Sequence, residues 1–162
     1  MAYPTLNFHP IPQFAGIQPI DATSATQQHP LGTIVTAKDD TYGVGEFIYL
    51  KGAALTAKGD AVTYTVKPGA TVRAAANGRG AVAVAMSANV AGQYGWYCIS
   101  GCVPVAATAA AAGGLAYLTA TPGALDDAVV AGDKVDGAVF AEATAAGFAT
   151  IQLSRPSATG SA

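Results

Sequence analysis

Histidine and cysteine are the side chains of this sequence best suited to acid–base, nucleophilic or metal chemistry. The histidines are His9 and His29, and both lie in a proline-rich segment at the start of the chain. Acid–base groups normally sit on rigid elements that hold them within hydrogen-bonding reach of a substrate. We therefore interpret both histidines as exposed or packed residues of that segment, without a catalytic role.

The two cysteines, Cys98 and Cys102, are too far apart along an extended strand to form a disulfide. Their Cα atoms would be separated by about 13 Å, whereas a disulfide needs roughly 4.4–6.8 Å. Only a sharp bend at Ser100–Gly101 could join them. We expect two free thiols in a reducing compartment, behaving as small buried hydrophobic residues.

Other sequence patterns that support chemistry are incomplete. The cysteine pair lacks the second pair that a structural zinc site needs. The acidic loop containing Asp126, Asp127, Asp133 and Asp136 does not match a complete calcium-binding loop. Gly78-Arg79-Gly80 is not followed by the lysine of a phosphate-binding loop. We therefore predict no catalytic, cofactor-binding or metal-binding residue, and a protein that is not an enzyme.

Composition narrows the class of protein further. Charged residues make up 11% of the 162 residues, and the net charge is −2. An average soluble domain carries roughly 25% charged residues, so we expect much of this surface to be covered in use. Lysines and arginines occur singly, which argues against nucleic-acid binding. No apolar window of about 20 residues predicts a membrane span, and no targeting signal is visible.

Residues 1–31 form a predicted extended arm that differs from the rest of the chain. Five of the nine prolines occur in it, separated by large apolar residues. Such a segment becomes ordered when it lies on another surface, which could be its own domain or a neighbouring subunit. We favour the neighbour, and predict that the contacts are made by Tyr3, Leu6, Phe8, Ile11, Phe14, Ile17 and Ile20. Residues Asp21–His29 are predicted to be a flexible connector.

Residues 32–156 are predicted to form a single β-rich body, followed by a flexible tail at 157–162. Short β-branched or alternating segments are separated by turn signals every ~8–15 residues, which is typical of an all-β sandwich or barrel. Thr108–Gly114 is ambiguous, with at most one or two helical turns. The predicted strands are Thr33–Thr36, Glu46–Leu50, Asp60–Val66, Thr71–Arg73, Ala81–Met86, Gly95–Gly101, Leu115–Thr119, Val135–Ala143 and Thr150–Leu153. Cys102–Val105 either continues the strand before it or starts an edge strand, since Pro104 cannot donate a ladder hydrogen bond.

Aromatic residues cluster in one of these segments. In a strand, Tyr94 and Trp96 share one face and Tyr97 occupies the other. Trp96 could anchor the core, and the three residues could also mediate self-association, since Tyr and Trp bury large areas at interfaces. A third possibility is a sugar-binding platform formed by Tyr94 and Trp96.

Several segments of the chain resemble those of a known protein family. The segment Ala91–Gly101 (AGQYGWYCISG) resembles the G-Q-x-G-W-V-x-I-x-G segment of the capsid cement, or head decoration, proteins of tailed bacteriophages. Similar segments follow in the same order at Leu115–Gly123, Gly137–Val139 and Leu153–Pro156, and Gly45–Gly52 and Gly59–Val62 resemble the first strands of the family. The resemblance covers about Gly32–Pro156 and does not include the proline-rich arm.

The resemblance implies a β-sandwich or barrel-like fold of jelly-roll or β-tulip type and a function without catalysis. Such a protein binds the outer surface of an assembled capsid and bridges neighbouring major capsid protein subunits. The implied partners are the major capsid protein and further copies of the chain in a homodimer or homotrimer. The implied location is the virion surface, after synthesis in the bacterial cytoplasm. The alternatives are a virion-surface module that binds host glycans and a self-polymerising virion subunit.

Overall fold

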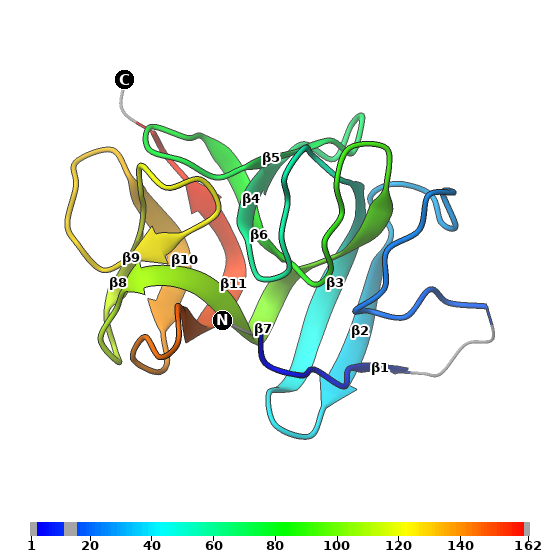
Figure 1. Ribbon diagram of the computed structural model, residues 1–162, viewed down its shortest axis with the longest axis horizontal. Coiled ribbons are helices and arrows are strands. Elements are labelled where there is room, and N and C mark those ends of the chain that lie inside the picture. The colour runs from blue at the N-terminus through cyan, green and yellow to red at the C-terminus, as the bar shows by residue number, and fades with distance from the viewer. Residues whose placement is uncertain (1–2, 12–15, 161–162) are drawn as a thin grey trace.

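The computed structural model describes residues 3–11 and 16–160, and these residues form an all-β structure (Figure 1). No helix occurs among them, so Thr108–Gly114 is not helical: its first two residues belong to a strand and a turn follows. The strands are β1 (His9–Ile11), β2 (Ile34–Asp39), β3 (Gly43–Lys51), β4 (Ala61–Tyr64), β5 (Thr71–Arg73), β6 (Gly80–Ala85), β7 (Tyr94–Ala109), β8 (Leu115–Leu118), β9 (Leu125–Asp126), β10 (Lys134–Phe140) and β11 (Phe148–Ala158).

Six strands close into a barrel. The ring runs from β7 through β9, β8, β10, β11 and β6 back to β7, and β11 also pairs directly with β7. β6 fills the gap where β7 and β11 diverge, because it pairs with the first half of β7 and the last residues of β11. A closed ring leaves few unpaired backbone groups, which favours a rigid body. The coarse prediction of an all-β barrel or sandwich is confirmed.

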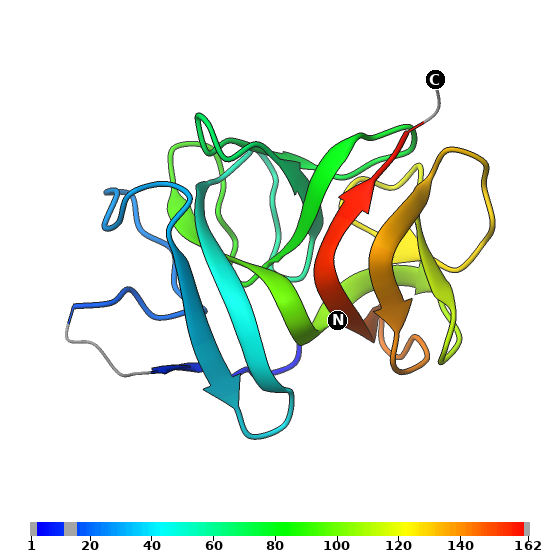
Figure 2. The same cartoon turned by 180° about the vertical axis from the view of Figure 1, so that it is seen from behind.

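The remaining strands extend the sheet on both sides of the barrel. β2 and β3 lie beside the first half of β7, and β1 pairs with the outer edge of β2. β4 and β5 continue from β6. Seen from behind, β2 and β3 stand on one side and β10 and β11 on the other, with β7 between them (Figure 2). The 16-residue β7 is therefore common to both halves of the molecule.

Two hydrophobic clusters occupy opposite faces of β7. Trp96 and Cys98 belong to the larger cluster, which includes the barrel interior. Tyr97 and Ile99 belong to a smaller cluster with side chains of β3, β4 and β6. Side chains of a strand alternate between its faces, so the predicted separation of Trp96 from Tyr97 is confirmed. Because both faces of this part of β7 are buried, its sequence is continuously apolar.

A bulge and a glycine contact redirect β7 in the middle of its length. Its register against β3 shifts at Ile99, and Gly101 has a φ of +108°. A Cβ atom on Gly101 would lie 2.8 Å from the Cα of Gly45 on β3. Only glycine permits this backbone conformation at so close an approach. Cys98 and Cys102 both lie within the continuous strand β7 and are free thiols, as predicted.

Several predicted boundaries differ from the structure. β11 continues to Ala158, which is buried and pairs with both β10 and β6, so residues 157–158 belong to the body and not to the predicted tail. Of the two possibilities for Cys102–Val105, the structure shows that it continues the preceding strand within β7 and does not start an edge strand. The sequence analysis missed β1 in the arm and the two-residue β9. Both are too short to show a periodic pattern.

Candidate attachment surfaces

The first arm segment, Tyr3–Ile11, lies across the body of its own chain. Tyr3 donates a hydrogen bond from its hydroxyl to the carbonyl of Pro104 at 2.9 Å, and its ring packs edge-on against Phe148. Phe8 packs in the same way on Phe47 of β3. At the end of the segment β1 pairs with β2, the outer strand of the sheet. This segment is therefore attached by the packing of its aromatic side chains and by one short strand pairing.

The second arm segment, Ile17–His29, is attached through buried hydrogen bonds centred on Gln18. The Tyr49 hydroxyl donates to Oε1 of Gln18 at 2.7 Å, and the Trp96 indole N–H donates to its carbonyl at 2.8 Å. Nε2 of Gln18 donates to the carbonyls of Ala22 and Tyr94. Buried polar groups that are all paired fix one arrangement of the chain, so this segment is part of the folded core.

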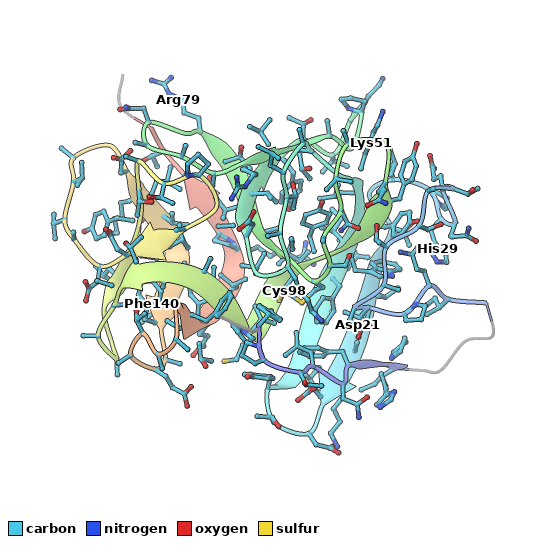
Figure 3. The ribbon with its side chains drawn as sticks, viewed as in Figure 1. Asp21, His29, Lys51, Arg79, Cys98 and Phe140 are labelled. Carbon is cyan, nitrogen blue, oxygen red and sulfur yellow. The ribbon has the colours of Figure 1, made fainter. Side chains whose placement is uncertain are left out.

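His29 completes this arrangement. Its Nε2 accepts the backbone N–H of Gln18 at 3.1 Å, and its ring lies 5.0 Å from Tyr49 and 5.4 Å from Trp96. Ser24 exchanges two backbone hydrogen bonds with Tyr94. The predicted flexible connector Asp21–His29 therefore contains ordered contacts with the body. The interpretation of His29 as a packed residue agrees with its place, shown on the arm side of the molecule in Figure 3.

The described parts of the arm lie on the body of their own chain and not on a neighbouring subunit. Leu6, Phe8 and Ile20 are 5%, 9% and 2% exposed and join the larger hydrophobic cluster. In this conformation they cannot serve as the predicted capsid contacts. Tyr3 and Ile17 are half-buried, and Ile11 is 46% exposed. Of the predicted arm contacts, Ile11 is the most accessible, and Phe14 lies outside the described residues.

The aromatic cluster of β7 is mostly internal. Trp96 and Tyr97 are fully buried, and Tyr94 is half-buried against the larger cluster. The core interpretation of Trp96 is therefore correct. A sugar platform built on Tyr94 and Trp96 would need an accessible indole face, so this glycan-binding hypothesis is wrong for this conformation.

The groups that could perform chemistry are dispersed. Cys98 is buried at the centre of the molecule (Figure 3), and burial raises the pKa of its thiol, which makes it unreactive. Cys102 is more accessible, and burial followed by the charge of Glu142 raises the pKa of its thiol. Within the described ranges, no three His, Cys, Asp or Glu side chains are grouped to hold a metal ion. Nor do these residues include a helix long and apolar enough to cross a membrane.

Apolar side chains are exposed on loops and on the outer strands. Leu55 in the β3–β4 loop is 78% exposed, and Val129 in the β9–β10 loop is 81% exposed. Neither residue could be singled out from the sequence, because neither Leu55 nor the pair Val129-Val130 belongs to a periodic pattern. The other exposed large apolar side chains are Ile11, Ile34, Val44, Val66, Val72, Val90, Leu115, Val130 and Val139.

Comparison with known proteins adds no relative to this description. No family model, curated protein or solved structure matches the chain.

Proposed function

We propose that this protein is a non-enzymatic capsid cement, or decoration, protein of a tailed bacteriophage. In this proposal it binds the outer surface of the assembled capsid and bridges neighbouring major capsid protein subunits. The phage assignment comes from the resemblance of Ala91–Gly101 and the segments that follow it. The attachment role is supported by a single structural observation: a closed, charge-poor barrel exposes Leu55, Val129 and other large apolar side chains.

The exposed side chains explain how such a protein would bind without a deep site. Each contributes little free energy, because burial of apolar area yields roughly 25 cal/mol per Å² and ordering of the partner opposes it. Several copies held in one oligomer would bind much more tightly than one copy, since the later contacts form within the same assembly. A rigid barrel helps, because little conformational entropy is lost when it binds.

The packing of the arm changes the proposed mode of attachment. Deletion of residues 2–20 would remove Leu6, Phe8, Gln18 and Ile20 from the core, so loss of binding by that variant could reflect unfolding. We place the contacts instead on side chains that are already exposed. Ile11 is the arm residue that meets this condition.

To test capsid binding, the purified protein is mixed with empty shells of the major capsid protein from the same phage genome. Co-sedimentation measures occupancy, and the temperature at which decorated shells disrupt measures stabilisation. We expect saturable binding and an increased disruption temperature. The paired changes Val66→Ser/Val72→Ser and Val129→Ser/Val130→Ser alter the β4–β5 hairpin and the β9–β10 loop, so weaker binding by one pair identifies the attached region. No binding of the folded protein at micromolar concentration would disprove the proposal.

Native mass spectrometry of the free protein addresses the self-association part of the proposal. A closed dimer or trimer agrees with a cement protein. Open-ended polymers would favour the alternative of a self-assembling virion subunit.

A further inference from the structure

A groove crosses the outer face of the barrel between two turns that are far apart in the sequence. Its floor is formed by Cys102 and Pro104 of β7 and Thr150 of β11. Tyr42, from the β2–β3 turn, forms one wall, and Glu142, from the β10–β11 hairpin, forms the other. Both turns lie along the lower side of the molecule in Figure 1. We refer to this feature as the Tyr42–Glu142 groove.

The groove is large enough for a side chain or a small ligand. Two adjoining hollows of about 330 and 150 Å³ share Tyr42, Glu142 and Thr150 as lining residues. Small-molecule sites usually begin at roughly 300 Å³. The floor is rigid, because β7 and β11 pair continuously from Phe148 to Ser154. The groove therefore does not depend on a mobile loop for its base.

Glu142 places a negative charge in the groove without a cation beside it. The Thr150 hydroxyl donates to Oε2 of Glu142 at 2.5 Å. Among the described residues, the ion pairs are Lys38–Asp40, Arg73–Asp60, Lys134–Asp136 and Arg155–Glu46. Glu142 belongs to none of them. The hydroxyl orients the carboxylate but leaves its charge uncompensated.

The charge of Glu142 acts on the other groups of the groove. Burial is the main cause of the raised pKa of Cys102, and Glu142 adds to it. Burial also raises the pKa of Tyr42, with additional contributions from Asp39 and Glu142. A neutral phenol ring beside an uncompensated carboxylate is a favourable environment for a cation, since the ring face attracts positive charge and the carboxylate pairs with it.

We propose that the Tyr42–Glu142 groove binds an arginine side chain of a partner protein, with the guanidinium paired to Glu142 and stacked on Tyr42. Arginine fits better than lysine because its planar group can form two parallel hydrogen bonds to a carboxylate while it stacks on an aromatic ring. If the protein decorates capsids, the partner is the capsid subunit. That identification rests on the proposed function, whereas the chemistry of the groove does not.

A second copy of this chain is a poor source of the arginine. Arg73 and Arg155 are already paired with carboxylates. Arg79, the remaining arginine, has an interaction partner of its own. Use of any of them would break an existing contact, so the charge pattern favours an arginine from a different protein.

Cys102 provides a reporter for occupation of the groove. Iodoacetamide would alkylate its thiol slowly at pH 9, where the thiolate fraction is larger than at neutral pH. Cys98 is fully buried and serves as the internal control. The probe is the peptide acetyl-Gly-Arg-Gly-amide, and the control peptide contains neutral citrulline in place of arginine. Peptide mass spectrometry follows alkylation of each cysteine separately.

With a dissociation constant near 1 mM, 10 mM of the arginine peptide would slow alkylation of Cys102 about 10-fold. The citrulline peptide should slow it less than two-fold. Glu142→Gln should abolish the difference between the peptides. Glu46→Gln, which changes the only other glutamate of the chain, should preserve it. Tyr42→Leu should weaken protection by roughly two- to five-fold through loss of stacking.

Equal protection by both peptides, or no protection by the arginine peptide at 10 mM, would overturn the proposal. Circular dichroism confirms that each variant is folded. The result is separable from the capsid test. Shell binding without peptide protection would disprove the arginine site but not the decoration role. Peptide protection without shell binding would disprove the decoration role but not the arginine site.

Discussion

Both arm segments pack on the same body, but different interactions hold them there. The second arm segment enters the core through the buried hydrogen bonds of Gln18, and it also supports Tyr49 and Trp96. The first arm segment lies across the body, held by apolar contacts of Tyr3, Leu6 and Phe8 and by the edge pairing of β1. Loss of the second segment would leave buried polar groups without partners, whereas loss of the first would mainly expose apolar area. We infer that the second segment unfolds with the body and that the first can detach from it.

Gln18→Ala should have the largest effect, because it removes the centre of the second arm segment. The Tyr49 hydroxyl and the carbonyls of Ala22 and Tyr94 lose hydrogen bonds, and we expect the free energy of unfolding to fall by about 3 kcal/mol. Urea unfolding monitored by tryptophan fluorescence measures this loss. Gln27→Ala is the matched control, since Gln27 is exposed and should change stability by less than about 0.5 kcal/mol.

Tyr3→Ala should have a smaller effect that is confined to the first arm segment. The change removes the contact with Phe148 and the hydrogen bond to Pro104, and we expect a cost of about 2 kcal/mol, below that of a fully buried aromatic residue. Hydrogen exchange should increase at residues 3–11 but not at residues 17–29. Equal increases in both segments would contradict the distinction between them. Tyr3→Phe keeps the ring and should show about half of the effect.

Acidification should also loosen the first arm segment, through the carboxyl group of Asp39 that accepts the backbone N–H of Asn7. Burial of the Asp39 carboxyl opposes its ionisation, but the backbone N–H groups of Asn7, Tyr42 and Thr41 and the nearby His9 outweigh burial and lower its pKa. The stabilisation is therefore complete above the ordinary aspartate pKa of about 4, and it is lost as the pH falls through the lower pKa of the folded state.

Asp39→Asn tests this pH dependence. It should cost about 1.5 kcal/mol at pH 7 and flatten the decrease in stability between pH 5 and pH 2.5. Asp40→Asn is the control, because the Asp40 side chain is 93% exposed and pairs only with exposed Lys38. An unchanged acid profile in Asp39→Asn would show that other carboxyl groups control the first arm segment.

Val129→Ser should have the smallest effect on the isolated protein. Its side chain is 81% exposed and supports neither arm segment, so the free energy of unfolding should change by less than about 0.5 kcal/mol. Thermal unfolding checks this expectation. A large loss would mean that the β9–β10 loop is packed in solution, which would remove Val129 from the exposed residues available for attachment.

The sequence predicted those parts of the fold that depend on local pattern. Apolar segments separated by turn residues indicated an all-β body, and alternation placed Trp96 and Tyr97 on opposite faces of β7. The surface under the arm could not be predicted in the same way. Leu6 and Phe8 are apolar whether they lie on their own chain or on a neighbour, and the choice depends on the position of Phe47 and other distant residues.

Long-range geometry also limited what could be predicted about candidate sites. Tyr42, Cys102 and Glu142 are separated by 40 residues or more in sequence, and only the closure of the barrel brings them together. The close approach of Gly45 to Gly101 could not be predicted for the same reason. A glycine in a strand can mark a bulge, but the strand register determines which residue it contacts. Exposed residues such as Leu55 gave no periodic signal at all.

Closure of the barrel through β11 has a consequence for how the protein is made. β11 pairs with β10, β7 and β6, and of these four strands it is the last to leave the ribosome. Until then, β7 would expose Val103 and Val105 along an unpaired edge, which invites association between nascent chains. Pairing between strands that are distant in sequence is also slow. The barrel therefore cannot close before β11 has emerged, and high expression at elevated temperature should direct newly made chains into aggregates.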